Sequence, residues 1–158
     1  EDGSSIDVFK ISCNKDLENA ICNCADPRRT FILEESIDFK ELTVPILNGR
    51  CLPAVEIKTS ESFYNFNAKY VNEDTQLTEL VLSTDDKNKL EKICLKTLDV
   101  SGCSGWLRVD LMQDRNNKFY VLEVNTAPGM TSHSLFPKSA ESIGLSYNQL
   151  VQEIINAN

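Results

Sequence analysis

The sequence predicts an α+β fold with antiparallel or mixed sheets and flanking helices. Strand-like runs follow one another between residues 30 and 58, and two more lie within 106–125. Apolar residues recur at helical spacing in 14–25, 84–100 and 146–156. Because these strands and helices do not alternate regularly, the chain lacks the pattern of a parallel α/β protein.

Length, composition and charge narrow the class of protein. A chain of 158 residues suffices for about one domain with its own core. The net charge of −8 and the pI near 4.7 argue against a binder of nucleic acid or of anionic membranes. No apolar run approaches the roughly 18 residues that span a bilayer. We expect a cytoplasmic protein, and the start at Glu1 rather than Met suggests a fragment of a longer chain.

The six cysteines are scattered, and none belongs to a CxxC pair. This spacing favours reduced thiols over a disulfide framework or a zinc site. We expect them to behave as small, mostly buried hydrophobic residues of a cytosolic enzyme.

The N-terminal part is expected to contain a strand, a helix and a second strand. Residues 8–12 resemble a short strand, and Asn14 is a suitable N-cap for a helix over 14–25. An Asp-Pro pair then ends the helix, since the residue before proline disfavours helical backbone. The next strand is expected over 30–37.

Two strands joined by a tight turn are expected to follow. The runs 41–48 and 51–58 flank Asn48-Gly49, a strong hairpin signal because both residues tolerate positive φ. The proline in each run indicates an edge position or a bulge. The polar stretch 60–83 is expected to be a long loop with a helical turn.

Three further helices are expected in the C-terminal half. The first covers 84–100, with Thr84 as its N-cap and acids in its first turn. The other two lie near 137–143 and over 146–156, the last with Ser146 as its N-cap.

The hairpin between these helices places charged residues opposite each other. If the Asn-Asn pair at 116–117 forms a two-residue turn, residues whose numbers sum to 233 are partners. Asp110 then lies opposite Glu123, and Arg108 opposite Asn125, all on one face because side chains alternate along a strand. The other face is apolar and is expected to be core; it comprises Leu107, Val109, Leu111, Leu122 and Val124.

The paired acids predict a site for a divalent metal ion. Asp110 and Glu123 repel each other across the ladder unless a cation lies between them. Mg²⁺ prefers carboxylate and other hard oxygen ligands with phosphate oxygens, so Asn125 is a suitable third ligand. Arg108 is then available to a phosphoryl or acyl oxygen. The alternative is a solvated hairpin face whose acids have no function.

The loop after the hairpin, 126–134, has the composition of an anion site. It contains Gly129, three hydroxyl side chains after it, and the only histidine of the chain. Backbone N–H and hydroxyl donors in such a loop bind carboxylate or phosphate. Its position beside the acidic face favours the functional interpretation of that face.

One long run, GWLRVDLMQDRNNKFYVLEVNTAPGMTSHSLFPKSAESIGLSYNQLV, resembles the C-terminal region of bacterial D-alanine–D-alanine ligases of the ATP-grasp superfamily. EDGSSIDVFKI is similar to the family's Gly-Ser-Ser loop, ILEESIDFKELTVPIL to its adenine-side strand, and YNFNAKY to the segment before its mobile loop. The resemblance implies the C-terminal portion of an ATP-grasp fold. Residues 1–37 would be a remnant of the central subdomain, and 38–158 the C-terminal domain.

The resemblance also implies roles for individual residues. Arg108 matches an arginine that stabilises the acyl phosphate and the tetrahedral species, while Ser134 and the Gly129 backbone match the site of the second D-alanine's carboxylate. Ser4 and Tyr70 match a catalytic pair. The matches for two Mg²⁺ ions, which Mn²⁺ can replace, are Asp110, Glu123 and Asn125. The matches for ATP are Glu34, Glu41, Lys69 and Met112.

The implied reaction has two steps and two D-alanine molecules. ATP phosphorylates the carboxylate of one D-alanine, and the amine of the second attacks the acyl phosphate to give D-alanyl-D-alanine, a peptidoglycan precursor. The family's N-terminal part completes the site, so we expect the chain to need that missing part and to be inactive alone. Family members are commonly homodimers, through surfaces largely outside this chain.

Departures from the family pattern keep alternatives open. Asp7 stands where the family usually has glycine, and Glu35 where it commonly has lysine, which predicts altered affinity for ATP. A degenerate nucleotide-binding module without turnover is therefore one alternative. Another is a related ligase that makes D-alanyl-D-lactate or D-alanyl-D-serine.

Overall fold

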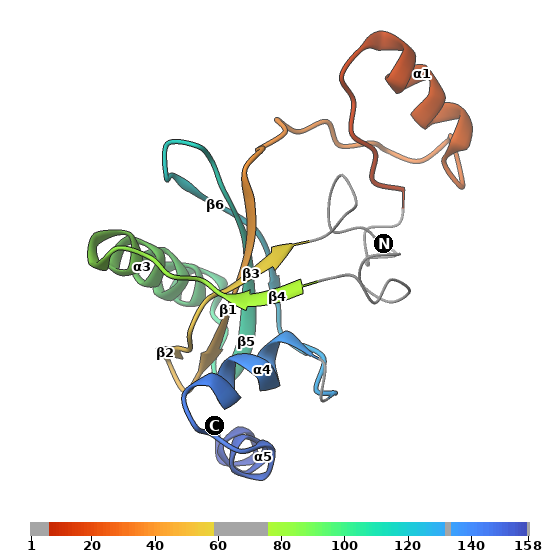
Figure 1. The fold of residues 1–158 in the computed structure, drawn as a ribbon. Helices are drawn as coiled ribbons and strands as arrows, with labels where there is room; N and C mark the ends of the chain where they lie inside the picture. Colours follow the sequence, from red (N-terminus) through yellow and green to blue (C-terminus); the bar gives the residue numbers. More distant parts are fainter. Residues whose placement is uncertain (1–6, 59–75, 132–133, 158) are drawn as a thin grey trace. The chain divides into compact units, whose positions relative to one another are not determined.

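The structure is a computed structural model that describes residues 7–58, 76–131 and 134–157 (Figure 1). The chain divides into two compact units: residues 7–37 belong to the first, and the remaining described residues to the second. Within the described ranges, no helix is both long and apolar enough to cross a membrane.

Helix α1 (Asn14–Asn23) is the regular element of the first unit. Its N-cap is Cys13 and not the predicted Asn14. The reason is the carboxylate of Asp16, which accepts hydrogen bonds from the backbone N–H groups of Ser12 (2.9 Å) and Cys13 (3.1 Å). The helix therefore begins where a side chain satisfies the backbone donors that precede its first turn.

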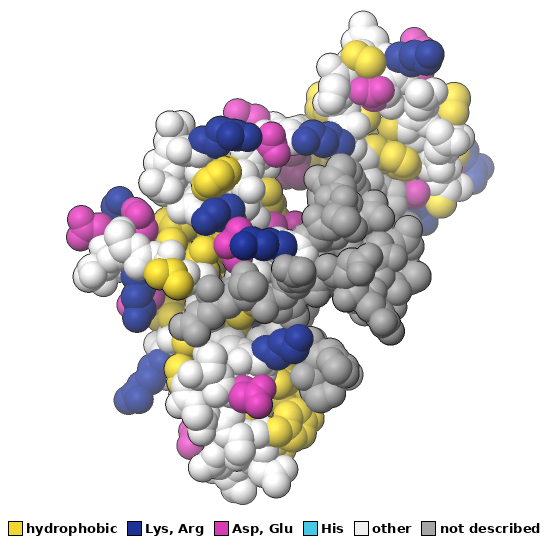
Figure 2. Space-filling view, viewed as in Figure 1, with side chains coloured by type: hydrophobic (Ala, Val, Ile, Leu, Met, Phe, Trp, Pro, Cys, Tyr) yellow, Lys and Arg dark blue, Asp and Glu magenta, His cyan; other side chains and the backbone are white. Residues whose placement is uncertain are grey.

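The strands predicted over 8–12 and 30–37 are wrong, because neither segment pairs with a strand among the described residues. Their apolar side chains are exposed, Val8 to 52% and Ile32 to 84%. Figure 2 shows such hydrophobic side chains on the surface of the unit that carries α1. A strand needs partners for its backbone N–H and C=O groups, so strand-like composition alone does not make one.

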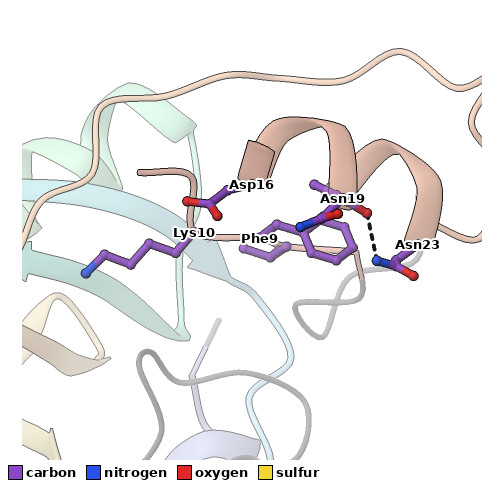
Figure 3. A pocket seen from close by; sticks show the side chains of 7 residues that line it. Phe9, Lys10, Asp16, Asn19 and Asn23 are labelled. Carbon is purple, nitrogen blue, oxygen red and sulfur yellow. Dashed lines mark hydrogen bonds between the residues drawn. The ribbon is translucent and has the colours of Figure 1, made fainter. Parts of the chain in front are cut away.

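An open pocket of about 410 Å³ lies between α1 and the segment before it (Figure 3). Along the helix side of the pocket, Asn23 Nδ2 donates to the carbonyl of Asn19 (2.8 Å). The lining residues are Val8, Phe9, Lys10, Asp16, Asn19, Ala20 and Asn23. None of them is a site residue predicted from the sequence.

The second unit contains a six-stranded antiparallel sheet (Figure 1). Its order is β4-β3-β1-β5-β6, and the short β2 pairs with the end of β1. The strands are β1 (Lys40–Leu47), β2 (Arg50–Cys51), β3 (Val55–Lys58), β4 (Gln76–Glu79), β5 (Trp106–Gln113) and β6 (Phe119–Asn125). With helices beside this sheet, the predicted α+β class is confirmed.

The turn predicted at Asn48-Gly49 joins β1 to β2. Both residues have positive φ, 51° and 73°, as a type I′ turn requires. The strand predicted over 51–58 is instead divided into β2 and β3, with Pro53 between them, because proline has no N–H for a ladder. The stretch predicted as a loop over 60–83 contains β4, which exists through its pairing with β3; residues 59–75 lie outside the described ranges.

Helix α3 (Thr84–Ser101) packs on one face of the sheet. Its N-cap is Ser83, one residue before the predicted Thr84, since the Ser83 hydroxyl accepts a hydrogen bond from the backbone N–H of Asp86 (3.2 Å). Leu90 and Cys94 are buried against apolar side chains of the two central strands. These are Leu42, Val44, Ile46, Leu107, Val109 and Leu111.

Two C-terminal helices, α4 (Leu135–Ser142) and α5 (Tyr147–Ile155), form a second hydrophobic cluster with the sheet. Phe136 and Leu150 have no exposed surface in this cluster, and the Phe136 ring meets that of Trp106 edge-on at 5.6 Å. The N-cap predicted for the last helix, Ser146, is confirmed. Helix α4 starts two residues earlier than the predicted 137.

All six cysteines are free thiols, but only Cys24 and Cys94 are buried, so the prediction that most are buried is wrong. Cys13 and Cys22 are exposed on the surface of the first unit. A hydrogen bond with Cys51 and burial both raise the pKa of the Cys94 thiol, which keeps it protonated in the core.

The turn between β5 and β6 is organised by Asp114. Its backbone N–H donates to the carbonyl of Lys118 (3.0 Å). Asn117 has a positive φ of 62°, so the turn spans 115–117 rather than the predicted pair 116–117. The Asp114 carboxylate in turn accepts hydrogen bonds from the backbone N–H groups of Asn116 (2.8 Å) and Lys118 (2.9 Å).

We expect Asp114 to titrate below the ordinary range of an aspartate. Hydrogen bonds from the backbone N–H of Lys118 and Asn116, and from the Tyr120 hydroxyl, lower the pKa of Asp114 from 3.8. Because the folded pKa is depressed, the stabilisation is complete above the unfolded pKa and is lost as the pH falls through the folded pKa. An NMR titration of the carboxyl carbon measures this pKa. In Asp114→Asn, the loss of stability as the pH falls below the unfolded pKa should be smaller. A titration at or above 3.8 would contradict the expectation.

Candidate functional site

The register predicted for the site face is confirmed. Asp110 pairs with Glu123, and Arg108 pairs with Asn125. The numbers in each pair sum to 233, as counted from the sequence.

The register near the turn differs from the prediction. Leu111 pairs with Val121 there, so that the paired numbers sum to 232. A β-bulge at Leu122 adds one residue to β6 and restores the predicted sum on the site face. The bulge leaves Leu122 54% exposed, so the prediction that it belongs to the core is wrong.

Asp110 is the centre of a buried hydrogen-bond network. Only 7% of the residue is exposed. Arg108, two residues earlier on the same face, donates from Nε to Oδ1 (2.8 Å) and from a terminal nitrogen to Oδ2 (2.7 Å). Thr43 on β1, directly opposite Asp110, donates from its hydroxyl to Oδ1 (2.6 Å). This charge-assisted pairing offsets the repulsion expected between Asp110 and Glu123.

The donor atoms on this face fit a hard divalent cation. Asp110 supplies a carboxylate beside that of Glu123, whose residue is exposed. Asn125 adds an amide oxygen, which already accepts a hydrogen bond from the backbone N–H of Ala127 (3.1 Å). The described ranges contain no cluster of three or more His, Cys, Asp or Glu side chains that could hold a metal ion. Two carboxylates and one amide suit Mg²⁺, which keeps positions for water and phosphate oxygens.

The residues predicted to contact ATP are divided between the units. Glu41 on β1 and Met112 on β5 are direct partners in the ladder, and both are half-buried. By the two-residue period they share the face of Asp110. Glu34 belongs to the first unit and is exposed. Lys69, with the proposed pair Ser4 and Tyr70, lies outside the described residues.

The structure brings together the two residues predicted to bind a substrate carboxylate. A Cβ atom on Gly129 would lie 3.0 Å from the Ser134 hydroxyl oxygen, so glycine permits this approach. The backbone N–H of Thr131 donates to the same oxygen (3.0 Å). Ser134 is the N-cap of α4, where backbone N–H groups and the helix dipole favour an anion.

Sequence reasoning missed two residues that support the site. Thr43 lies in a predicted strand, but its contact with Asp110 depends on the pairing of β1 with β5, which no local pattern reveals. Tyr147 on α5 donates its hydroxyl to the carbonyl of Met130 (2.8 Å) and so ties the loop to the helix.

Two departures from the family pattern now have a structural context. Asp7 has a positive φ of 57°, a conformation that glycine adopts most easily, and its carboxylate accepts a hydrogen bond from the backbone N–H of Ala25 (3.0 Å). The Asp7 carboxylate is therefore held by a hydrogen bond within the first unit. Glu35 is exposed.

Comparison with known proteins identifies the family of the chain. Residues 1–156 match the family model described as "D-ala D-ala ligase C-terminus". The chain belongs to this family. The D-alanine–D-alanine ligase of Haemophilus ducreyi is 41% identical over 154 residues, which is 98% of this chain and 51% of that protein. The enzyme of Mannheimia succiniciproducens is 41% identical over 155 residues. The chain thus spans about half the length of the curated relatives it matches.

Solved structures of ATP-grasp D-alanine ligases share the fold. The Bacillus anthracis ligase complexed with ATP is 34% identical with a TM-score of 0.67, over 78% of this chain and 39% of that one. The VanG D-Ala:D-Ser ligase of Enterococcus faecalis is 27% identical with a TM-score of 0.80, over 98% of this chain and 46% of that one.

We expect removal of one partner of the Arg108–Asp110 ion pair to destabilise the fold strongly. The Arg108→Met variant leaves a buried carboxylate with the Thr43 hydroxyl as its remaining donor, and should lower the free energy of unfolding by about 3 kcal/mol. Urea unfolding of this chain measures the change. The double variant Arg108→Met/Asp110→Leu should recover most of the loss, because no uncompensated charge remains.

The matched control is Arg50→Met, at an exposed arginine of the same sheet. It should change the free energy of unfolding by less than about 0.5 kcal/mol. Equal losses in Arg50→Met and Arg108→Met would show that the pair makes no special contribution.

Proposed function

We propose that the chain is the C-terminal half of an ATP- and Mg²⁺-dependent ligase that joins two D-alanines through an acyl phosphate. The observation that carries this proposal is the face on which Asp110 lies opposite Glu123 and Arg108 opposite Asn125, in a chain of this family. Residues 1–37 would belong to the central subdomain and 38–158 to the C-terminal domain. The dipeptide would serve as a peptidoglycan precursor in the cytoplasm, made by an enzyme that assembles as a homodimer.

The proposed chemistry divides among the residues of the site. Asp110, Glu123 and Asn125 would hold Mg²⁺ or Mn²⁺, which neutralises phosphate charge when bound. Arg108 would stabilise the oxyanion that develops as the acyl phosphate and the tetrahedral species form, because its bonds to Asp110 fix the position of the guanidinium charge on this face. Phosphate then leaves as the peptide bond forms.

Substrates would be held on both sides of that face. The hydroxyl of Ser134 and the backbone at Gly129 would bind the carboxylate of the second D-alanine. Glu41 and Met112, with Glu34 and Lys69, would hold ATP. Ser4 and Tyr70 would act as a catalytic pair. Positioning and charge neutralisation, rather than covalent catalysis, would supply most of the rate enhancement.

The chain alone should not make dipeptide, because the relatives are about twice its length. Incubated with D-alanine, ATP and Mg²⁺, the 158-residue protein should give no D-alanyl-D-alanine by mass spectrometry. A chimera that adds the N-terminal half of the Haemophilus ducreyi ligase before residue 1 should make it. Asp110→Asn in the chimera should lower kcat by roughly 100-fold.

The control in the same chimera is Asp99→Asn, at an exposed aspartate on α3. It should leave the rate unchanged. A folded chimera that releases neither dipeptide nor ADP would contradict the proposed function and favour a nucleotide-binding module without turnover. Dipeptide made by the chain alone would contradict the need for a second half.

A D-alanyl-D-serine ligase is the second candidate, supported by the likeness to the VanG D-Ala:D-Ser ligase over 98% of this chain. Competition of D-alanine with D-serine or D-lactate in the chimera separates the products. We expect D-alanyl-D-alanine to predominate, because the 41% identical relatives are D-alanine–D-alanine ligases. A larger kcat/KM for D-serine would reverse this assignment.

A further inference from the structure

Thr43 is a buried hydroxyl residue in contact with the centre of the candidate site. It has no exposed surface, and the pairing of β1 with β5 places it directly opposite Asp110. Its hydroxyl donates to Oδ1 of Asp110 at 2.6 Å, within the range of strong bonds between a hydroxyl and a carboxylate. No buried side-chain nitrogen or oxygen in the described part of the chain lacks a partner, so this hydroxyl belongs to a satisfied network.

The two oxygens of Asp110 are held differently. Oδ1 accepts hydrogen bonds from both the Thr43 hydroxyl and Nε of Arg108. Oδ2 accepts one bond, from a terminal nitrogen of Arg108. Because Arg108 and Asp110 share a strand, the arginine alone would let the pair move together. The bond from Thr43 comes from the neighbouring strand and ties the carboxylate to the rest of the sheet.

We propose that Thr43 is a positioning residue of the site, which fixes the Asp110 carboxylate so that Oδ2 keeps acceptor capacity for a divalent cation. This inference rests on the proposed function, because the proposed function makes the Asp110 carboxylate a metal ligand whose orientation matters. Threonine suits the task because its branched side chain restricts χ1 and holds the hydroxyl in one direction. Valine has the same shape and no hydroxyl, and serine has the hydroxyl and more rotational freedom.

Binding of Mn²⁺ to the full 158-residue chain tests the inference, with the free ion measured by electron paramagnetic resonance. Thr43→Val should weaken binding roughly tenfold, the loss expected for one hydrogen bond to a charged group. Thr43→Ser should restore it to within about threefold. Asp110→Asn should remove the site. Thr97→Val, which deletes a hydroxyl bonded to the carbonyl of Ile93 on α3, should leave binding unchanged.

A second measurement needs no metal. In a double-mutant cycle of Thr43→Val and Asp110→Leu, which leaves no acceptor for the Thr43 hydroxyl, urea unfolding should show coupling of roughly tenfold in the unfolding equilibrium constant. The same cycle with Thr97→Val in place of Thr43→Val should be additive, because Thr97 bonds within its own helix.

The outcomes separate the inference from the proposed function. If Thr43→Val binds Mn²⁺ as tightly as the wild type while Asp110→Asn does not, Thr43 has no positioning role and the metal site stands. If the wild type binds no Mn²⁺, the divalent site itself fails in this chain. The cycle then decides whether Thr43 holds Asp110: tenfold coupling supports that contact, and additivity overturns it.

Discussion

The pairing of β1 with β5 is the contact on which the second unit depends. Eight residue pairs join these strands, from Lys40 with Gln113 to Leu47 with Trp106. One face of the pair carries the buried side chains under α3. The other face carries Thr43 beside Asp110, and at its end Leu47 and Trp106 pack against α4 and α5. Hydrophobic burial on both faces thus holds the polar network in register.

That network orients its side chains more than it stabilises the fold. Desolvating an arginine and an aspartate costs about as much as their attraction returns, so a buried pair adds little net stability over apolar residues of the same size. What such a pair does provide is orientation. With Asp110 held from two strands, its carboxylate and the Arg108 fork are preorganised, which is the main contribution a protein makes to reactions that develop charge.

The loop beyond β6 carries the proposed site for a substrate carboxylate. Gly129 approaches Ser134 closely, and Ser134 begins α4. The loop is tied to α5 by the bond from Tyr147 to the carbonyl of Met130. Helix packing at this end of the sheet therefore positions a candidate carboxylate site that lies a few residues beyond Asn125 on the chain.

Local patterns predicted much of this. The turn at Asn48-Gly49, the helix after Ser146 and the paired acids all follow from short-range rules, because positive φ, capping and the two-residue period depend on neighbours along the chain. The predicted register on the site face is also confirmed, although the two-residue turn assumed for it is not the one that forms. The three-residue turn at 115–117 moves the pairing by one residue, and the bulge at Leu122 moves it back.

The sequence by itself determined which residues have the chemistry of the site: two carboxylates, an amide, an arginine and a donor-rich loop. It also determined the family, through motifs that run through most of the chain. Only the tertiary structure decided that 8–12 and 30–37 form no ladder, that 76–79 becomes a strand, and that Thr43 meets Asp110. Each of these depends on a partner distant in sequence, because backbone donors and buried hydroxyls are satisfied by whichever strand the whole fold brings beside them.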